Sequence, residues 1–366
     1  MTKIKWWRNR RRHRERIPAV RDAVPTARDL TVIVPAYNEA PSLRDTILSL
    51  QNQSVPPAEI IVVDDCSTDD THEVARQLGV TVMRPPRNTG SKAGAQNFAL
   101  PRVRTERVMA VDADTTLAPD AIEKLEAAFL DRSVAAACGF VLPRHVRTLW
   151  ERGRYIEYLF AFTFYKQVQD YYDKPLISSG CFSMYTTEAL RQHGGWSTRT
   201  LAEDMDLTWS FHCAGKAVRF VPEAVCYPIE PANFKLMSKQ LRRWSHGFVQ
   251  NVRLHWKPVL QVPYLRSAVA VATWDAIIAS TVYLFLVPAL ALALRNPWPL
   301  LGYVIDVPAL LVPITVAAVK RGELARAWVS FPAFLVLRTV NALFFLEAVW
   351  SEWVRGRSFM VYEKGH

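Results

Sequence analysis

The chain has 366 residues and is 50% hydrophobic, which is enough to bury the core of one large domain together with something smaller. Its formal net charge of +11 predicts an anionic partner, such as a membrane surface, a phosphorylated small molecule or nucleic acid. The five cysteines form no CxxC pair and are odd in number, which argues against both a zinc site and a full disulfide framework.

Residues 1–28 form a basic arm that contains two neighbouring tryptophans, Trp6 and Trp7. Lysine and arginine attract anionic headgroups, and tryptophan favours the interface between a bilayer and water. We therefore expect the arm to contact a lipid bilayer with anionic headgroups rather than nucleic acid. A solvated arm without a fixed partner is the alternative.

Residues 29–232 have the alternating pattern of an α/β domain. Apolar runs at residues 30–36, 59–64 and 80–84 predict strands, and residues 42–51 predict a helix between the first two. This alternation predicts a parallel sheet that binds its ligand at the carboxyl ends of the strands. Because GxGxxG and Walker spacings are absent, a nicotinamide enzyme and a P-loop NTPase are both disfavoured.

Another apolar run begins at Arg107 and ends in two carboxylates, Asp112 and Asp114. In a strand, residues i and i+2 point to the same face, so the two carboxylates would converge where the strand meets solvent. Paired oxygen ligands suit Mg2+ or Mn2+ carrying a phosphorylated substrate. Simple turn chemistry is the alternative.

Two later segments also carry polar groups at informative positions. Glu203 and Asp204 open a predicted helix, although the helix dipole alone favours acids there. Residues 233–262 predict an amphipathic helix that places Gln240, Arg243 and Trp244 on one face, where they could cap a diphosphate and cover a sugar ring. Between these segments, the glycines before Trp196 could form either the floor of a sugar site or a tight loop.

Residues 263–366 predict a membrane region with about three helices. Residues 267–294, 298–318 and 331–349 are apolar and long enough to span a bilayer. With a cytoplasmic catalytic domain, three crossings would leave Arg355 and Arg357 outside, against the positive-inside rule, so an interfacial third segment is the alternative. Three charged residues within these segments could line an acceptor path, namely Asp275, Asp306 and Arg338.

Six motifs along residues 29–256 resemble those of family 2 glycosyltransferases, which have a GT-A fold. They are Val34-Pro-Ala-Tyr-Asn-Glu39, Val63-Asp-Asp-Cys-Ser67, Asn88-x-Gly90-x-Lys92-Ala-Gly94, Val111-Asp-Ala-Asp114, Ala202-Glu-Asp204 and Gln240-x-x-Arg243-Trp244. The resemblance implies a GT-A nucleotide-sugar-binding (Rossmann-like) α/β domain, then an amphipathic interface helix and a small α-helical transmembrane domain. Ala202 departs from the family pattern, because the processive members have threonine there.

The same resemblance implies a role for each motif residue in binding a UDP-sugar and a divalent cation, Mn2+ or Mg2+. Asp204 would be the general base and Glu203 would support it. Asp112 and Asp114 would hold the metal, Asp112 also contacting the nucleotide. The remaining donor-binding residues would be Pro35, Tyr37, Glu39 and Asp65 around the base, Lys92 near the diphosphate or ribose, and Gln240, Arg243 and Trp244 as the cap.

The function expected from this resemblance is that of an integral membrane, metal-dependent, inverting glycosyltransferase that extends a glycan. Few predicted spans follow the catalytic domain, so either a homo-oligomer forms or a lipid or lipid-linked acceptor receives a single sugar. A non-catalytic membrane protein that binds polyanions is a further alternative.

Overall fold

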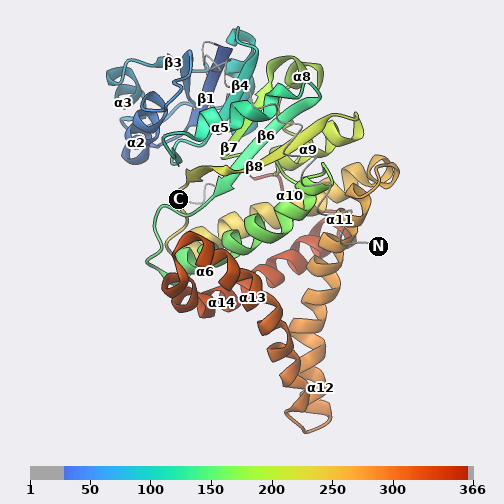
Figure 1. Cartoon of the computed structure of the whole chain (residues 1–366). Helices are drawn as coiled ribbons and strands as arrows, with labels where there is room; N and C mark the ends of the chain where they lie inside the picture. The colour runs from blue at the N-terminus through green and yellow to red at the C-terminus, as the bar shows by residue number, and fades with distance from the viewer. Residues whose placement is uncertain (1–28, 362–366) are drawn as a thin grey trace, which may run out of the picture.

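A mixed eight-stranded sheet forms the centre of the computed structural model of the chain (Figure 1). The structure describes residues 29–361 except for the side chains of residues 305 and 306, so the basic arm and Asp306 lie outside the description. The strand order is β3-β2-β1-β4-β7-β6-β8-β5. The strands are β1 (Leu30–Ala36), β2 (Glu59–Asp64), β3 (Thr81–Met83), β4 (Arg107–Val111), β5 (Thr116–Leu117), β6 (Val134–Val141), β7 (Phe182–Thr186) and β8 (Ala217–Tyr227).

The predicted parallel arrangement is present among β1 to β4 but does not extend across the whole sheet. Strands β3, β2, β1 and β4 are parallel to one another as predicted. However, β7 runs antiparallel to both β4 and β6, and β5 runs antiparallel to β8. Strand–helix alternation is a local signal, and it does not reveal the direction of strands that join the sheet from later in the chain.

Helices cover both faces of the sheet because the side chains of β1 alternate between two cores. Val32 and Val34 pack with α2, α3 and α5, whereas Ile33 packs with α4, α8 and α9. The helices are α2 (Ala40–Gln51), α3 (Thr71–Gln77), α4 (Lys92–Ala99), α5 (Ala121–Glu126), α8 (Thr187–Gln192) and α9 (Glu203–Cys213).

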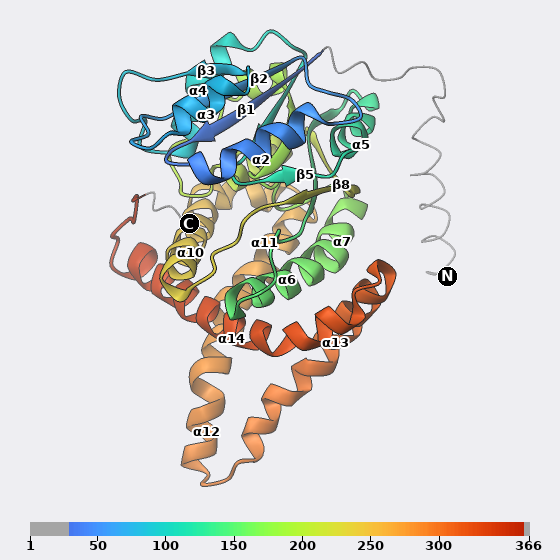
Figure 2. The same cartoon turned by 90° about the vertical axis from the view of Figure 1, so that its left-hand side faces the viewer.

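Beneath this domain lies a platform of long helices (Figure 2). It consists of α6 (Leu149–Phe160), continued by η4 (Ala161–Tyr165) and α7 (Lys166–Tyr171), together with α10 (Phe234–Gln261) and α14 (Leu324–Val349). The predicted amphipathic helix is present as α10, whose Asn233 side chain caps the N-terminus by accepting the Leu236 N–H. Thr148 and Glu151 likewise form a capping box that starts α6.

An apolar hairpin projects from the platform away from the sheet (Figures 1 and 2). One arm contains α11 (Leu265–Trp274), η5 (Asp275–Ala279), η6 (Val282–Leu286) and α12 (Val287–Ala293), and the other contains η7 (Trp298–Leu301) and α13 (Gly302–Arg321). Among the described residues, three helices are long and apolar enough to cross a membrane: Leu265–Ala293, Trp298–Arg321 and Leu324–Val354. The prediction of three such helices is confirmed.

Candidate active site

Four elements bring charged side chains to one end of the sheet. Strand β2 ends beside Asp65, β4 ends beside Asp112, helix α4 begins with Lys92, and α9 begins with Glu203 and Asp204. The carboxyl ends of β1, β2 and β4 lie at the same edge because these strands are parallel. The sheet therefore places the ends of several motifs together at the edge where α/β domains bind ligands.

Lys92 connects three of these elements. Its ammonium group forms an ion pair with Asp112, lies 3.8 Å from Oε1 of Glu203, and donates a hydrogen bond of 2.9 Å to the carbonyl of Gly180. The side chain is nearly buried, so water screens these charges little. Lys92 thus joins β4, α9 and the segment before β7 in one charged cluster.

The carboxylate of Asp204 is held by two backbone amides. The N–H of Gly180 donates to Oδ2 at 2.8 Å, and the N–H of Met205 donates to Oδ1 at 2.8 Å. A Cβ atom on Gly180 would lie 3.1 Å from that Oδ2 and 3.2 Å from Nζ of Lys92, so the bare backbone allows this close approach. These contacts fix the orientation of the carboxylate that the sequence suggests as the general base.

Glu203 lies beside Asp204 but in a drier environment. Its side chain is buried, and burial raises its pKa, while the positive charges of Lys92 and Arg243 oppose that increase. Glu203 therefore retains a proton more readily than an exposed glutamate. This difference favours a supporting role for Glu203 rather than that of the base.

Asp112 and Asp114 are not aligned by strand alternation as expected, because β4 ends at Val111 and both residues lie in the following turn. Asp112 remains partly exposed beside Lys92, whereas Asp114 is buried and accepts a hydrogen bond of 3.0 Å from Thr115. Among the residues the structure describes, no group of three or more His, Cys, Asp or Glu side chains could hold a metal ion. Two carboxylates still suit Mg2+ or Mn2+ when substrate phosphates and water supply the other ligands.

Asp65 supports the loop that leads into α4. Its carboxylate accepts the N–H of Thr89 at 2.8 Å and the hydroxyl of Thr89 at 2.9 Å, and its carbonyl accepts the side-chain amide of Asn88 at 2.7 Å. The carboxylate is buried in this arrangement. A nucleotide base that bound Asp65 would therefore contact a carboxylate that also holds this loop.

The residues expected beside Asp65 differ in their surroundings. Pro35 is half-buried in β1, and Tyr37 is exposed. Glu39 is buried, and its carboxylate accepts the hydroxyl of Ser42 at 2.7 Å, which holds the first turn of α2. These contacts give Glu39 a local structural role, whether or not it also lines a nucleotide pocket.

A cavity of about 250 Å³ lies beside the cluster, and Glu203 is the one predicted site residue in its wall. Its lining includes residues around the start of α4 and Met360 near the end of the described chain. The complete lining is Thr89, Gly90, Ser91, Ala93, Thr198, Thr200, Leu201, Glu203 and Met360. The hydroxyl and glycine positions make this wall compatible with a polar ligand.

Helix α10 fixes the segment that precedes Glu203. Oε1 of Gln250 accepts the N–H of Leu201 at 3.0 Å, and the side-chain amide of Asn251 donates to the carbonyl of Ala202 at 3.1 Å. Gly247 lets the two backbones touch, because a Cβ atom there would lie 2.7 Å from Cβ of Ala202. Ala202, the departure from the family pattern, is therefore packed directly against α10.

Arg154 was not identified from the sequence, yet it lies behind the predicted cap on α10. Its guanidinium donates to Oε1 of Gln240 at 2.6 Å and stacks 4.4 Å from the Trp244 ring. It is buried and forms ion pairs with Glu157 and, at 3.4 Å, with Glu230. The i,i+3 pair of Arg154 and Glu157 was the only local signal, and it is common on ordinary solvated helices.

Trp196 does not form a sugar floor. It is buried in the core, where its ring packs edge-on against Tyr185, and its backbone N–H donates to Oδ1 of Asn97 at 2.9 Å. Gly195 has a φ of +83°, and its missing Cβ leaves room for the Asn97 side chain. The tight-loop alternative is therefore the one that the structure supports.

Comparison with known proteins identifies the part of the chain that contains Lys92, Asp112 and Gly180. Residues 31–194 match the family model described as Glycosyl transferase family 2. The chain is 27% identical over 223 residues to poly-beta-1,6-N-acetyl-D-glucosamine synthase of Staphylococcus epidermidis, and that match covers 60% of this chain and 54% of the relative. The corresponding synthase of Staphylococcus aureus strain COL is 26% identical over 222 residues, with the same coverage. The chain thus spans about half the length of the curated relatives that it matches.

The fold is also similar to solved structures along most of the chain. The mannosyltransferase PcManGT from Pyrobaculum calidifontis, solved in complex with GDP-Man and Mn2+, is 21% identical with a TM-score of 0.59, covering 96% of this chain and 94% of that one. S. aureus TarS 1-349 is 17% identical with a TM-score of 0.50, covering 90% and 92% of the two chains. At these identities the likeness establishes the fold.

Proposed function

Because residues 31–194 form a glycosyl transferase family 2 domain, we propose that the chain is a membrane-bound inverting glycosyltransferase that transfers a sugar from a UDP-sugar to a growing glycan. One observation carries the proposal: Lys92, Asp112 and Asp204 come together around Gly180 at the carboxyl end of the sheet. This cluster combines a cation for a diphosphate, a carboxylate for a metal and a carboxylate for a proton.

In the proposed reaction, an acceptor hydroxyl attacks the anomeric carbon of the donor sugar from the face opposite the diphosphate. The new C–O bond forms as the bond to the diphosphate breaks, so the configuration at the anomeric carbon inverts. Asp204 takes the hydroxyl proton, and its two backbone hydrogen bonds hold the accepting carboxylate in place. A positioned base of this kind contributes about 10² to 10⁴ in rate.

The leaving diphosphate would be stabilised from two sides. Asp112 and Asp114 would hold a divalent cation, which supplies Lewis-acid stabilisation of phosphate oxygens when bound. Lys92 would contribute a fixed positive charge next to Asp112. From α10, Arg243 and Gln240 would bind the diphosphate and Trp244 would cover the sugar ring, as their shared helical face suggests.

Two kinds of acceptor are candidates for this reaction. The similarity to poly-N-acetylglucosamine synthases supports a growing polysaccharide or oligosaccharide. A single transfer to a lipid or lipid-linked acceptor is the second candidate, because the described helices include one projecting hairpin, which is too little to enclose a polymer channel within one chain. A homo-oligomer would remove that objection, so the native mass and the product length together separate the two candidates.

We further propose that the catalytic domain lies in the cytoplasm. The loop between α13 and α14 is flanked by Lys320, Arg321 and Arg326, as expected on the cytoplasmic side. All five cysteines are free thiols in the structure, which suits a reducing compartment.

The decisive experiment uses the purified full chain in nanodiscs with a panel of UDP- and GDP-sugars and either Mn2+ or Mg2+. We expect metal-dependent transfer from one UDP-sugar, which chelation with EDTA abolishes and added metal restores. Asp204→Asn should lower transfer at least about 10²-fold while leaving nucleotide affinity, measured by calorimetry, near the wild-type value.

Asp120→Asn is the matched control, because Asp120 is an acid at the start of α5 that pairs with Lys124 away from the cluster. It should transfer sugar at the wild-type rate. Wild-type transfer by Asp204→Asn would exclude Asp204 as the base, and the absence of transfer with every donor would exclude the proposed function.

A further inference from the structure

The described chain ends on the catalytic domain rather than across the hairpin from it. The carbonyl of Phe359 accepts the side-chain amide of Gln250 at 2.9 Å, and its N–H donates to Oε1 of Glu352 at 3.0 Å. Met360 lines the same cavity as Glu203. The catalytic domain ends at residue 232 and residue 360 lies against it again, so the chain between them crosses any bilayer an even number of times.

The hairpin is long enough to account for two crossings. From Thr281 to Pro313, no residue with a described side chain is buried. Near the base of the hairpin, Tyr283 contacts Thr339 of α14, and Leu310 and Leu311 pack against the core, whereas the rest of the two arms projects away from the platform. Residues 281–294 extend about 21 Å and residues 298–313 about 24 Å at the rise of an α-helix. Arg295 lies between the arms, at the tip.

Helix α14 contacts the other platform helices, α6 and α10, along its whole length, although it is long and apolar enough to span a membrane. At its start, Tyr155 donates a hydrogen bond of 3.0 Å to Glu323, and in its middle Leu337 packs in one core with Met237 and Leu241. After its end, Glu352 lies 2.9 Å from His246.

Close backbone packing adds to these contacts. A Cβ atom on Gly153 of α6 would lie 2.9 Å from the carbonyl of Ala333, so α6 and α14 touch without intervening side chains. Helix α10, which carries several lysines and arginines, is also held against α14 through the ion pair of Arg242 and Glu347 at 3.3 Å. A crossing by α14 would have to draw these charged neighbours into the hydrocarbon region, at a high cost in free energy.

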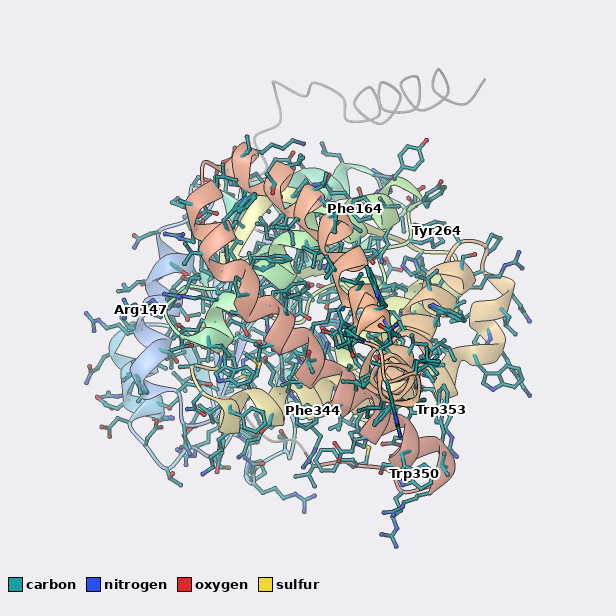
Figure 3. The ribbon with its side chains drawn as sticks, turned by 90° about the horizontal axis from the view of Figure 1, so that it is seen from below. Arg147, Phe164, Tyr264, Phe344, Trp350 and Trp353 are labelled. Carbon is teal, nitrogen blue, oxygen red and sulfur yellow. The ribbon has the colours of Figure 1, made fainter. Side chains whose placement is uncertain are left out.

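The opposite face of α14 is apolar and exposed. Val329, Val336, Leu343 and Trp350 follow one another at helical spacing on that face. In the view from below, Phe164, Phe344, Trp350 and Trp353 lie on the side from which the hairpin projects, with Arg147 at the rim (Figure 3). After the end of α14, the guanidinium of Arg355 lies 5.7 Å from the centre of the Trp350 ring, and tryptophan beside arginine is typical of the boundary between headgroups and hydrocarbon.

We infer that the chain crosses the bilayer twice, through the hairpin, and that α14 lies in the plane of the headgroup layer and supports the catalytic domain there. An interfacial helix sinks about 5 to 10 Å below the headgroups. The parts of the two arms that lie beyond α14 supply the rest of the path across a hydrocarbon layer of about 30 Å. Arg355 and Arg357 then lie on the same side as the catalytic domain, which removes the conflict with the positive-inside rule. The inference rests on the membrane attachment proposed above.

Single cysteines introduced into a cysteine-free background test the number of crossings. Asn296→Cys marks the hairpin tip, Ala325→Cys the start of α14, and Arg357→Cys the segment after it. A membrane-impermeant maleimide is applied to two preparations of sealed vesicles, in which opposite sides of the membrane face outward. We expect residues 325 and 357 to react from one side and residue 296 from the other.

Two results would overturn the inference. Reaction of residues 296 and 357 from the same side, opposite residue 325, would indicate three crossings, and reaction of all three from one side would indicate none. Sugar transfer by each variant is measured in parallel, so that loss of the proposed activity and failure of the topology are recognised separately.

A second measurement tests the depth of α14 directly. A fluorophore on Leu343→Cys of α14 should be quenched at least twice as strongly by spin labels near the headgroups as by labels near the bilayer centre. Phe285→Cys, on the exposed face of η6 near the middle of the expected crossing, is the control and should show the reverse order. Deep quenching at both positions would contradict the in-plane placement.

Discussion

At the scale of single residues, the chemistry depends on contacts between parts of the chain that are far apart in sequence. Asp204 was predicted from its motif, but its partner Gly180 lies 24 residues earlier, and Lys92 reaches Gly180 across 88 residues. A motif specifies which side chain is present and not which backbone amide will hold it. The sequence therefore predicted the carboxylates of the candidate site, while Arg154, Gln250 and Asn251 emerge from tertiary packing alone.

Glu126 gives a prediction about stability that is independent of the site. It is buried at the end of α5, and burial raises its pKa to about 7, although Arg107 lies 2.8 Å away and lowers it. The ordinary value is 4.5, so between pH 4.5 and about 7 the folded state binds more protons than the unfolded state. Stability from this group is therefore present at low pH and is lost as the pH rises through that window.

The difference in thermal midpoint between wild type and Glu126→Gln should thus change with pH. Relative to the variant, the wild type should lose up to about 3 kcal/mol of stability between pH 5 and 8, with most of the change between about pH 5 and 7. Thermal unfolding in detergent at several pH values measures this difference. Glu123→Gln, on the exposed side of α5, is the control, and a Glu126→Gln difference as flat as that of the control would contradict the prediction.

At the scale of elements, the sequence best predicted those strands and helices whose own residues show a clear hydrophobic pattern. Strands β1, β2 and β3 and helix α10 occur where the pattern predicts them. Strands β6 and β8 and the platform helix α6 were missed. The reason for β6 is visible in its composition, since all eight of its residues are buried and a continuous apolar run has no period to distinguish strand from helix.

The contact between α10 and the segment before α9 makes Gly247 a sensitive position. In Gly247→Ala, the new Cβ would lie 2.7 Å from Cβ and 2.8 Å from N of Ala202, so one of the two elements must shift. Ala202 directly precedes Glu203 and Asp204, and a displacement near 1 Å at a catalytic group costs about 10² in rate. We expect kcat to fall by at least about tenfold with the fold retained.

Gly302→Ala is the control for this substitution. Gly302 also lies in a helix, but its new Cβ would meet nothing closer than 3.9 Å, so we expect wild-type kcat. Steady-state kinetics and circular dichroism on both variants provide the measurement. Equal kcat values for the two alanine variants would show that α10 does not position the acids of α9.

At the scale of the whole molecule, the helices after the catalytic domain both anchor it and return the chain to it. Their hydropathy predicted three apolar helices, which are present, but hydropathy does not distinguish a helix that faces lipid on all sides from one that packs on protein along one face. That distinction came from Gly153, Leu337 and Glu352, whose contacts join α14 to the platform. The same path brings the chain back to the cavity beside Glu203.

This return makes Met360 the most distant residue in sequence that should influence donor binding. It forms part of the cavity wall together with Glu203, Thr89, Gly90, Ser91 and Ala93. Met360→Glu would place a negative charge where a nucleotide diphosphate approaches, raising KM for the donor about tenfold by repulsion in a partly solvated site, with little change in kcat. Val361→Glu adds the same charge one residue later, outside the cavity wall, and should leave KM unchanged. If both variants raise KM equally, the added charge acts regardless of its position, and residue 360 does not contact the donor in the active enzyme.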